Sequence, residues 1–220
     1  MEIIELIKQG ILKIFSPKNY WNNKWPRATI FYNARQGRAY DIKRFIAANC
    51  ALFFPLRQKL SINDNDEQED IALKVLKYMV KNYTYLRDSD EYWQFPEETY
   101  YALTGDCEDF SNLYVSICRT LGISAYRIKV CTGWVKVLEG SGFIGHAYPI
   151  FLAKDNQWRI MDCTYSTDIE TEVLDRPVAS LDKRYKDIWF TYNDCFSWRQ
   201  KDMEIKEKRL KDLFKKEVKA

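Results

Sequence analysis

The spacing of hydrophobic residues along the chain predicts two buried helices in its central part. Between residues 71 and 83, Ile71, Val75, Tyr78 and Met79 fall on one helical face. The segment 107–122 repeats this spacing and ends at glycine, a residue that commonly ends helices. Its apolar stripe consists of Cys107, Phe110, Tyr114, Ile117 and Leu121.

Beyond the second helix the spacing shortens to two residues. Ile128 and Val130 alternate with Arg127 and Lys129, which predicts a half-buried strand. After a glycine-containing loop at 139–145, two more strands are expected, at residues 146–153 and 157–163. We therefore predict an α+β fold in which an antiparallel sheet packs against the helix that begins at Cys107.

The flanking segments suggest three parts. The polar, acidic segment 61–70 is typical of a linker that runs into a helix, so we separate an N-terminal extension (residues 1–60) from a central domain (61–199). The extension is expected to contain an amphipathic helix near its start, ended by Pro17, and a buried helix at 41–54 opened by Asp41. The charged residues 200–220 predict a C-terminal helix.

Composition excludes several classes of protein. A hydrophobic content of 46% with 15% aromatic residues suits a globular core. A net charge of +3 is too small to indicate nucleic-acid binding, and no apolar run is long enough for a membrane span. The acidic, lysine-interrupted start is a poor secretory signal, so we expect a cytoplasmic protein, alone or in a larger particle, with reduced cysteines. Residues 1–60 or 200–220 are the segments through which a partner would dock.

Three side chains form a candidate catalytic group. Cys107 opens the second helix directly after a Thr-Gly-Asp turn. His146, the only histidine, begins the predicted strand at 146–153. Asp162 lies on the following strand, on the face shared with Trp158 and Ile160. A helix start followed by two neighbouring strands allows a thiol, an imidazole and a carboxylate to meet.

The chemistry of such a group favours a nucleophilic thiol. The free amides at a helix N-terminus and a nearby imidazolium both stabilise a thiolate. The backbone N–H of Cys107 is placed to hold a developing oxyanion. Asp162 would accept the other imidazole proton and fix the tautomer of His146.

The motifs around these residues resemble the transglutaminase-like cysteine hydrolase superfamily, and are most similar to bacterial transglutaminase-like cysteine proteinases. The similarity rests on LTGDCEDFSNLYVSICRTLGI, GHAYPIF and WRIMDCTY, preceded by a W-x-x-P-x-E approach to the cysteine, over residues 70–165. It implies a papain-like α+β core, makes 61–199 the catalytic domain, and carries over the triad Cys107, His146 and Asp162. The implied activity is hydrolysis of peptide or amide bonds through a thioacyl-enzyme, with a protein or peptide as substrate and no required cofactor.

The same resemblance raises two further expectations. Some periplasmic members bind calcium through the acids that flank the nucleophile, here Asp106 and Glu108, and carboxylate oxygens suit Ca²⁺; simple helix capping is the alternative. These acids also oppose a thiolate, so exposure, a basic neighbour or a cation must offset them. A second oxyanion donor would be an indole N–H or a side-chain amide, and Trp93 and Gln94 provide both.

Two other functions remain open at this point. A crosslinking transglutaminase would use the same triad with an amine in place of water. A non-catalytic member would keep the scaffold as a binding module within a larger assembly. The intact triad favours an enzyme, and peptide hydrolysis is the first choice.

Overall fold

A computed structural model describes residues 27–35, 38–87, 92–136, 142–164 and 169–199. The helices predicted near the start of the chain and at 200–220 lie outside these residues. All six cysteines lie inside them, and none is paired with another in a disulfide.

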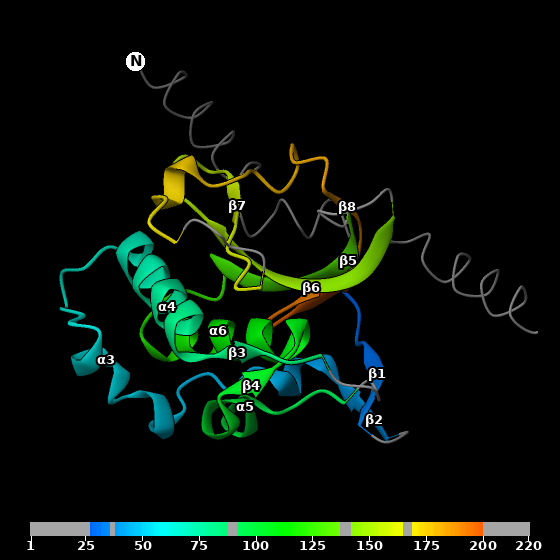
Figure 1. The fold of residues 1–220 in the computed structure, drawn as a ribbon, viewed down its shortest axis with the longest axis horizontal. Coiled ribbons are helices and arrows are strands. Elements are labelled where there is room, and N and C mark those ends of the chain that lie inside the picture. Colours follow the sequence, from blue (N-terminus) through cyan, green and yellow to red (C-terminus); the bar gives the residue numbers. More distant parts are fainter. Residues whose placement is uncertain (1–26, 36–37, 88–91, 137–141, 165–168, 200–220) are drawn as a thin grey trace, which may run out of the picture.

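The fold is a five-stranded antiparallel sheet with helices packed on one face, the inner face (Figure 1). The strand order is β7-β6-β5-β8-β9. Helix α6 contacts β5 and β6, while α4 and α5 contact α6. This confirms the predicted sheet packed against the Cys107 helix. The strands are β5 (Ile128–Lys136), β6 (Phe143–Leu152), β7 (Trp158–Ile160), β8 (Tyr185–Tyr192) and β9 (Ser197–Arg199), and the helices are α4 (Gln68–Asn82), α5 (Pro96–Ala102) and α6 (Cys107–Thr120).

Both predicted central helices are confirmed. The apolar face predicted for 71–83 is buried in α4, and the stripe predicted for 107–122 packs against the core in α6. The hydroxyl of Tyr114 in α6 donates to the backbone oxygen of Ala72 in α4 at 2.9 Å, which joins the two helices. Gly122 has a φ of 109°, a conformation that favours glycine and that ends the helical segment as predicted.

The segment before α4 differs from its prediction. A hairpin of β1 (Phe31–Arg35) and β2 (Arg38–Asp41) precedes it, and no sequence pattern indicated this hairpin. In place of one helix at 41–54 there are two 3-10 turns, Ile42–Phe45 and Ala51–Phe53. Asn49 interrupts them with a φ of 58°, outside the helical region. The expected role of Asp41 holds, since its side chain accepts from the Lys43 N–H at 3.1 Å.

The remaining elements are short. Strands β3 and β4 form a parallel pair that leads into α6. Their bounds, with those of the short helices, are β3 (Thr84–Tyr85), β4 (Thr104–Gly105), α3 (Leu56–Lys59) and the 3-10 turn Val173–Asp175.

Residues on both sides of the 61–70 segment share one hydrophobic core. Ile30, Phe45 and Phe53 are buried in the same cluster as Val75 and Leu113. The described part of the N-terminal extension therefore packs directly on the helices of the central domain. The division of the chain at 61–70 remains a prediction.

The strand predicted at 126–130 is present as the start of β5, but it is not half-buried, because the outer face of the sheet is also buried. Lys129 is only 2% exposed, and its ammonium lies 4.3 Å from the ring centroid of Trp158 and 4.0 Å from that of Trp198. These indoles compensate part of the cost of burying a cation, although burial still lowers the pKa of Lys129 well below its ordinary value. A basic residue in an alternating pattern thus faces an aromatic layer instead of water.

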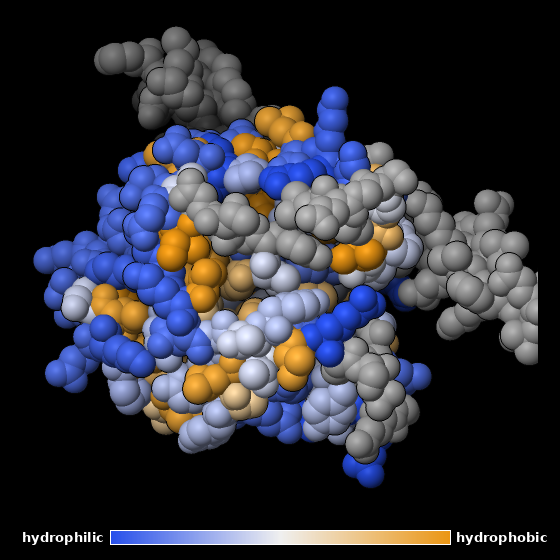
Figure 2. Space-filling view, viewed as in Figure 1, coloured by the Kyte–Doolittle hydropathy of each residue, from blue (hydrophilic) through white to orange (hydrophobic). Residues whose placement is uncertain are grey.

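The described surface is mixed in character. Figure 2 shows mainly hydrophilic side chains over the α3–α4 side of the molecule, with smaller hydrophobic patches between them. Within the described ranges, none of the helices combines the length and the apolar content that crossing a bilayer requires.

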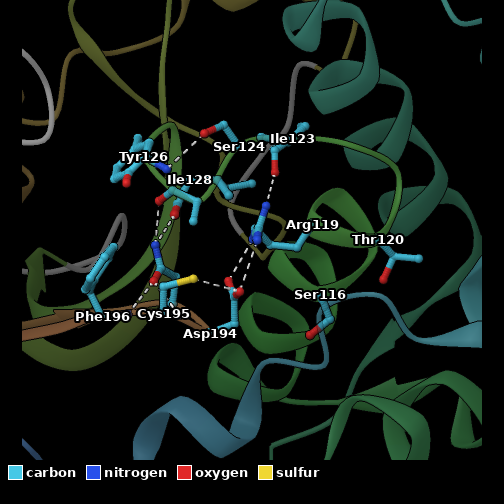
Figure 3. A network of polar contacts seen from close by, with 12 residues as sticks. Ser116, Arg119, Thr120, Ile123, Ser124, Tyr126, Ile128, Asp194, Cys195 and Phe196 are labelled. Atoms are coloured by element: carbon cyan, nitrogen blue, oxygen red, sulfur yellow. Dashed lines mark hydrogen bonds and ion pairs between the residues drawn. The ribbon is translucent and has the colours of Figure 1, made fainter.

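Polar contacts join the C-terminal half of α6 to two other segments of the chain (Figure 3). The Arg119 guanidinium points to Asp194 in the β8–β9 turn, with N–O distances of 2.7 and 3.1 Å, and also donates to the Ile123 carbonyl. One turn earlier on the helix, the Ser116 hydroxyl accepts from the Ala47 N–H at 3.0 Å. Because α6 begins with Cys107, these contacts also set the position of its N-terminal end.

We expect Arg119→Met to destabilise the fold by about 2 kcal/mol in urea unfolding, because it leaves a largely buried carboxylate without its cation. Arg57→Met is the matched control, since it breaks an ion pair to an Asp64 side chain that is 97% exposed, and exposed pairs contribute little. Equal unfolding midpoints for Arg119→Met and wild type would show that the Asp194 contact does not anchor α6.

Candidate active site

Cys107 is the first residue of α6, and the N-terminal end of this helix meets an uncovered edge of the sheet. The backbone N–H of Ala147 in β6 lies close enough to the Cys107 sulfur to lower the pKa of the thiol. Strand β6 pairs with β5 along one edge. Along its other edge, the pairing with β7 begins only at Ile150, so residues 143–148 have no partner on that edge among the described strands. The thiol therefore lies beside a strand edge that no described strand pairs, at the residue that follows His146; at His146, Ala147 and Tyr148 this edge is buried.

A tight turn between β4 and α6 brings the thiol to this edge. A Cβ added to Gly105 would lie 2.7 Å from the Cβ of Asp109, so this turn requires glycine. The Asp109 carboxylate accepts from the backbone N–H of Gln94 at 2.7 Å and of Asp106 at 3.3 Å. Asp109 thus stabilises the start of the helix and its connection to the preceding segment.

The W-x-x-P-x-E motif builds the scaffold before this turn. Pro96 is the first residue of α5, a position where its missing N–H costs nothing. The Glu98 carboxylate accepts from the Phe95 N–H at 2.6 Å and pairs with Arg35 of the β1 strand, also at 2.6 Å. The Trp93 side chain is buried in the core. Each motif residue therefore has a structural role in placing α5 and, through it, α6.

His146 and Asp162 form a buried pair. The Nε2 atom of His146 lies 2.8 Å from Oδ2 of Asp162, and the residues are 4% and 3% exposed. Asp162 lies two residues beyond the end of β7, not on the strand as predicted. Its carboxylate also accepts from the Tyr185 hydroxyl at 2.9 Å and from the Thr164 N–H at 2.8 Å. These three contacts hold the carboxylate in one orientation against the imidazole.

The charge state of Asp162 follows from these contacts. Burial by itself raises the pKa of Asp162, but the charge and hydrogen bond of His146 outweigh it, together with the bonds from Thr164 and Tyr185. The net pKa of Asp162 lies below its ordinary value. An ionised Asp162 accepts the Nε2 proton of His146, which leaves Nδ1 as the imidazole nitrogen that can exchange a proton with a thiol.

The electrostatics around the thiol differ from the expectation based on the helix terminus. Burial raises the pKa of Cys107 well above its ordinary value, the charges of Glu108 and Asp106 raise it further, and the Ala147 N–H lowers it only in part. The thiol donates to Oε2 of Glu108 at 3.1 Å. Burial and the flanking acids thus both disfavour the ionised thiol.

Asp106 and Glu108 form a compact acidic group with the thiol. One ligand atom from each of Asp106, Cys107 and Glu108 lies within 4.8 Å of the others. Burial, followed by the charge of Asp106, raises the pKa of Glu108 well above its ordinary value. A divalent cation would offset this repulsion, and carboxylate oxygens are ligands that Ca²⁺ prefers. The two carboxylates therefore fit the calcium expectation, and Asp109 is occupied by the backbone contacts described above.

The two predicted oxyanion donors have different surroundings. Trp93 stacks on Tyr192 with ring centroids 6.3 Å apart, and its buried indole N–H has no hydrogen-bond partner in the described part of the chain. The amide nitrogen of Gln94 donates to the Thr104 oxygen at 3.4 Å. The side chain of Gln94 is therefore engaged, whereas the indole of Trp93 retains a donor. Their roles in catalysis stay predictions.

Sequence reasoning missed Tyr185 and Thr164. Tyr185 lies on β8, in a stretch to which no pattern assigned an element, and it reaches Asp162 only because β8 joins the sheet beside β5. Thr164 contributes a backbone N–H, which no residue type reveals. Neither contact has a signal in the local sequence.

The fold and the geometry of this site can now be compared with known proteins. Residues 56–163 match the model of the transglutaminase-like superfamily. The chain carries a transglutaminase-like core. No curated protein sequence matches it. The matched segment begins at α3 and ends just after Asp162, so it contains Cys107, His146 and Asp162.

Solved structures of LapG from Legionella pneumophila share this transglutaminase-like core. An EGTA-treated form has a TM-score of 0.53 and 18% identity, and the match covers 69% of this chain and 75% of LapG. A calcium-bound form has a TM-score of 0.53 and 18% identity, with 68% and 77% covered. At this level of identity the likeness concerns the fold.

We expect Tyr185→Phe to reveal the ionised state of Asp162. The lowered pKa of Asp162 means that its contacts stabilise the fold above the ordinary carboxyl range, and that this contribution is lost as pH falls through the native pKa. Removing the hydroxyl should cost about 1–3 kcal/mol at pH 7 in urea unfolding, and the difference from wild type should narrow below about pH 4.

Tyr101→Phe is the matched control for this experiment, because Tyr101 is 72% exposed; it should leave the unfolding midpoint unchanged at every pH. A stability difference for Tyr185→Phe that stays constant down to pH 3 would contradict an ionised Asp162 as its acceptor.

Proposed function

We propose that this protein is a cysteine peptidase that hydrolyses amide bonds through Cys107, His146 and Asp162. The observation that supports it most is the buried 2.8 Å contact of His146 with Asp162, next to the strand position where the Cys107 sulfur meets the Ala147 N–H. A thiol at a helix N-terminus, beside an imidazole oriented by a carboxylate, is the arrangement that nucleophilic catalysis by cysteine requires.

The first half of the proposed reaction forms a thioester. Nδ1 of His146 takes the thiol proton as the Cys107 sulfur attacks the carbonyl carbon of the substrate. Asp162 stabilises the resulting imidazolium. The tetrahedral intermediate collapses, the C–N bond breaks, and the imidazolium transfers its proton to the leaving amine. Since burial and the flanking acids both raise the pKa of the thiol, the proposed proton transfer and attack occur together, without a thiolate formed beforehand.

The second half releases the acyl group. His146 takes a proton from a water molecule, whose oxygen attacks the thioester carbonyl. The C–S bond breaks, the carboxylic acid leaves, and the proton returns from the imidazolium to the sulfur. The protein thus ends the cycle in its starting protonation state.

Two donors are proposed for the oxyanion. The backbone N–H of Cys107 lies in the first turn of α6, where amides are free of intrahelical bonds. Trp93 is the better candidate for the second donor, because burying an N–H without a partner is costly unless a ligand uses it. Gln94 is the weaker one, since its amide already donates to Thr104.

A protein or peptide is the proposed substrate. An extended chain can pair with the edge of β6 at residues 143–145, where Phe143 and Gly145 are exposed and no described strand pairs with this edge, two residues from the Ala147 backbone beside the nucleophile. In this proposal residues 61–199 are the catalytic domain, and residues 1–60 or 200–220 are where a partner would dock. No cofactor is needed for the steps above.

We further propose that Asp106 and Glu108 bind Ca²⁺, an ion that is bound in one of the LapG structures. Their carboxylates would hold the ion next to Cys107, and the positive charge would favour the ionised thiol. The support in this chain is the close, buried pair of carboxylates whose mutual repulsion a cation would relieve.

The triad is tested by alkylation with iodoacetamide, read by mass spectrometry at each cysteine. We expect the rate at Cys107 to rise with pH and to fall at least about tenfold in His146→Ala at pH 7, because the imidazole accepts the thiol proton. Cys195 is exposed and serves as the internal reference in the same sample. Peptide cleavage should be abolished in both Cys107→Ala and His146→Ala, with circular dichroism showing that each variant is folded.

Other results would favour the alternative functions. Alkylation of Cys107 at the same rate with and without His146 would favour a non-catalytic binding module. Incorporation of a labelled primary amine into a glutamine peptide, without new peptide termini, would favour a crosslinking transglutaminase.

Calcium binding is tested by thermal unfolding. At about 100 times its Kd, Ca²⁺ should stabilise the fold by about 2.7 kcal/mol, or about 5–10 °C in Tm for a chain of this size. Glu108→Gln should remove the shift, while Glu172→Gln, at an exposed acid on a distant turn, should keep it. EGTA should reverse the shift. An equal response of the two variants would contradict a site at Glu108.

A further inference from the structure

Two tryptophans lie together on the inner face of the sheet beyond the N-terminal end of α6. Trp134 of β5 and Trp189 of β8 have ring centroids 4.9 Å apart and an interplanar angle of 90°. We call this pair the aromatic wall. Neither residue belongs to the motifs that predicted the catalytic group.

An irregularity in β8 brings Trp189 to this face. Thr132 pairs with Phe190 and Gly133 with Ile188, so the pairing of β5 with β8 skips Trp189. As a result, Trp189 and its neighbour Phe190 both pack with the inner core, whereas Ile188 packs with the outer one. Asp187 next to this bulge has a φ of 39°, a strained conformation for a residue with a side chain.

Trp189 reaches across β5 to the strand that carries His146. A Cβ added to Gly145 would lie 3.0 Å from the Trp189 ring, so the indole covers the residue just before His146. Trp134 is the register partner of the same glycine. The wall therefore stands over β6 two residues from Ala147, whose N–H meets the nucleophilic sulfur.

The wall is accessible from this side. Trp134 is 37% exposed, and Trp189 is only partly buried. Cys107 and Trp189 are both partly buried residues at the margin of the same core cluster. An extended chain on the exposed part of the β6 edge, residues 143–145, would consequently pass the wall before it reaches the thiol.

We infer that the aromatic wall selects substrates with an apolar side chain next to the bond that is cleaved. This inference rests on the proposed peptidase function and specifies its substrate class. Two edge-to-face indoles offer a large apolar surface without a charge, so they favour leucine or an aromatic residue and disfavour a carboxylate. The bulge and the glycine at position 145 are both needed to place this surface next to Ala147, the inner-face residue beside the Cys107 sulfur.

The test measures how peptides protect Cys107 of the full-length protein from iodoacetamide. The probes are acetylated, amidated pentapeptides with four alanines and a central phenylalanine, leucine or aspartate. In wild type, the phenylalanine and leucine peptides should half-protect Cys107 at concentrations at least tenfold lower than the aspartate peptide. In Trp189→Ala this ratio should fall below twofold, and Trp189→Phe should retain most of it.

Each variant is compared with its own alkylation rate without peptide, and circular dichroism checks its fold. Leu181→Ala, which truncates an apolar side chain that is 74% exposed, should keep the wild-type ratio. The inference is overturned if the tenfold preference is absent in wild type, persists in Trp189→Ala, or is lost equally in Leu181→Ala. Failure of the peptidase proposal would appear separately, as alkylation of Cys107 that does not depend on His146.

Discussion

The contact of the Cys107 sulfur with the Ala147 N–H is the point on which the site depends, because it joins the start of α6 to the uncovered edge of β6. A strand edge with free backbone groups is usually a liability. Here the start of α6 lies against one of these groups, at the residue that follows His146 in the chain. The Arg119–Asp194 contact holds the far end of the same helix to the same sheet. The position of the thiol therefore depends on how firmly α6 is packed against the sheet.

Three acidic residues, Asp106, Glu108 and Asp109, lie close to this contact, and they have different effects. Asp109 accepts backbone hydrogen bonds and stabilises the turn. Asp106 and Glu108 instead face each other and the thiol, and they raise the pKa of Cys107. Acidic residues in the first turn thus stabilise the helix start but make the thiol harder to ionise. A chain that needed only a capped helix would not require all three carboxylates at this position.

The sequence predicted the elements that have a regular hydrophobic period and a clear end. Both central helices, the antiparallel sheet and the approach of His146 to Asp162 followed from spacing and motifs. The wrong predictions have physical reasons. Asn49 interrupts the helix expected at 41–54. The indoles that contact Lys129 bury a basic residue, so the alternating pattern wrongly indicated that one face of the strand is exposed. Strands β8 and β9, with Tyr185 and Trp189, were missed because their contacts are formed only by tertiary packing.

The burial of Lys129 has a consequence for chemical labelling. Its ammonium lies between two indoles on a buried face of the sheet, and burial lowers the pKa of Lys129 well below its ordinary value, which favours the free amine. Such an amine is intrinsically reactive but shielded. Acylating reagents that modify surface lysines at once would reach Lys129 only when the outer layer of the sheet opens. This single side chain consequently acts as a built-in reporter of how often that layer separates from the rest of the molecule.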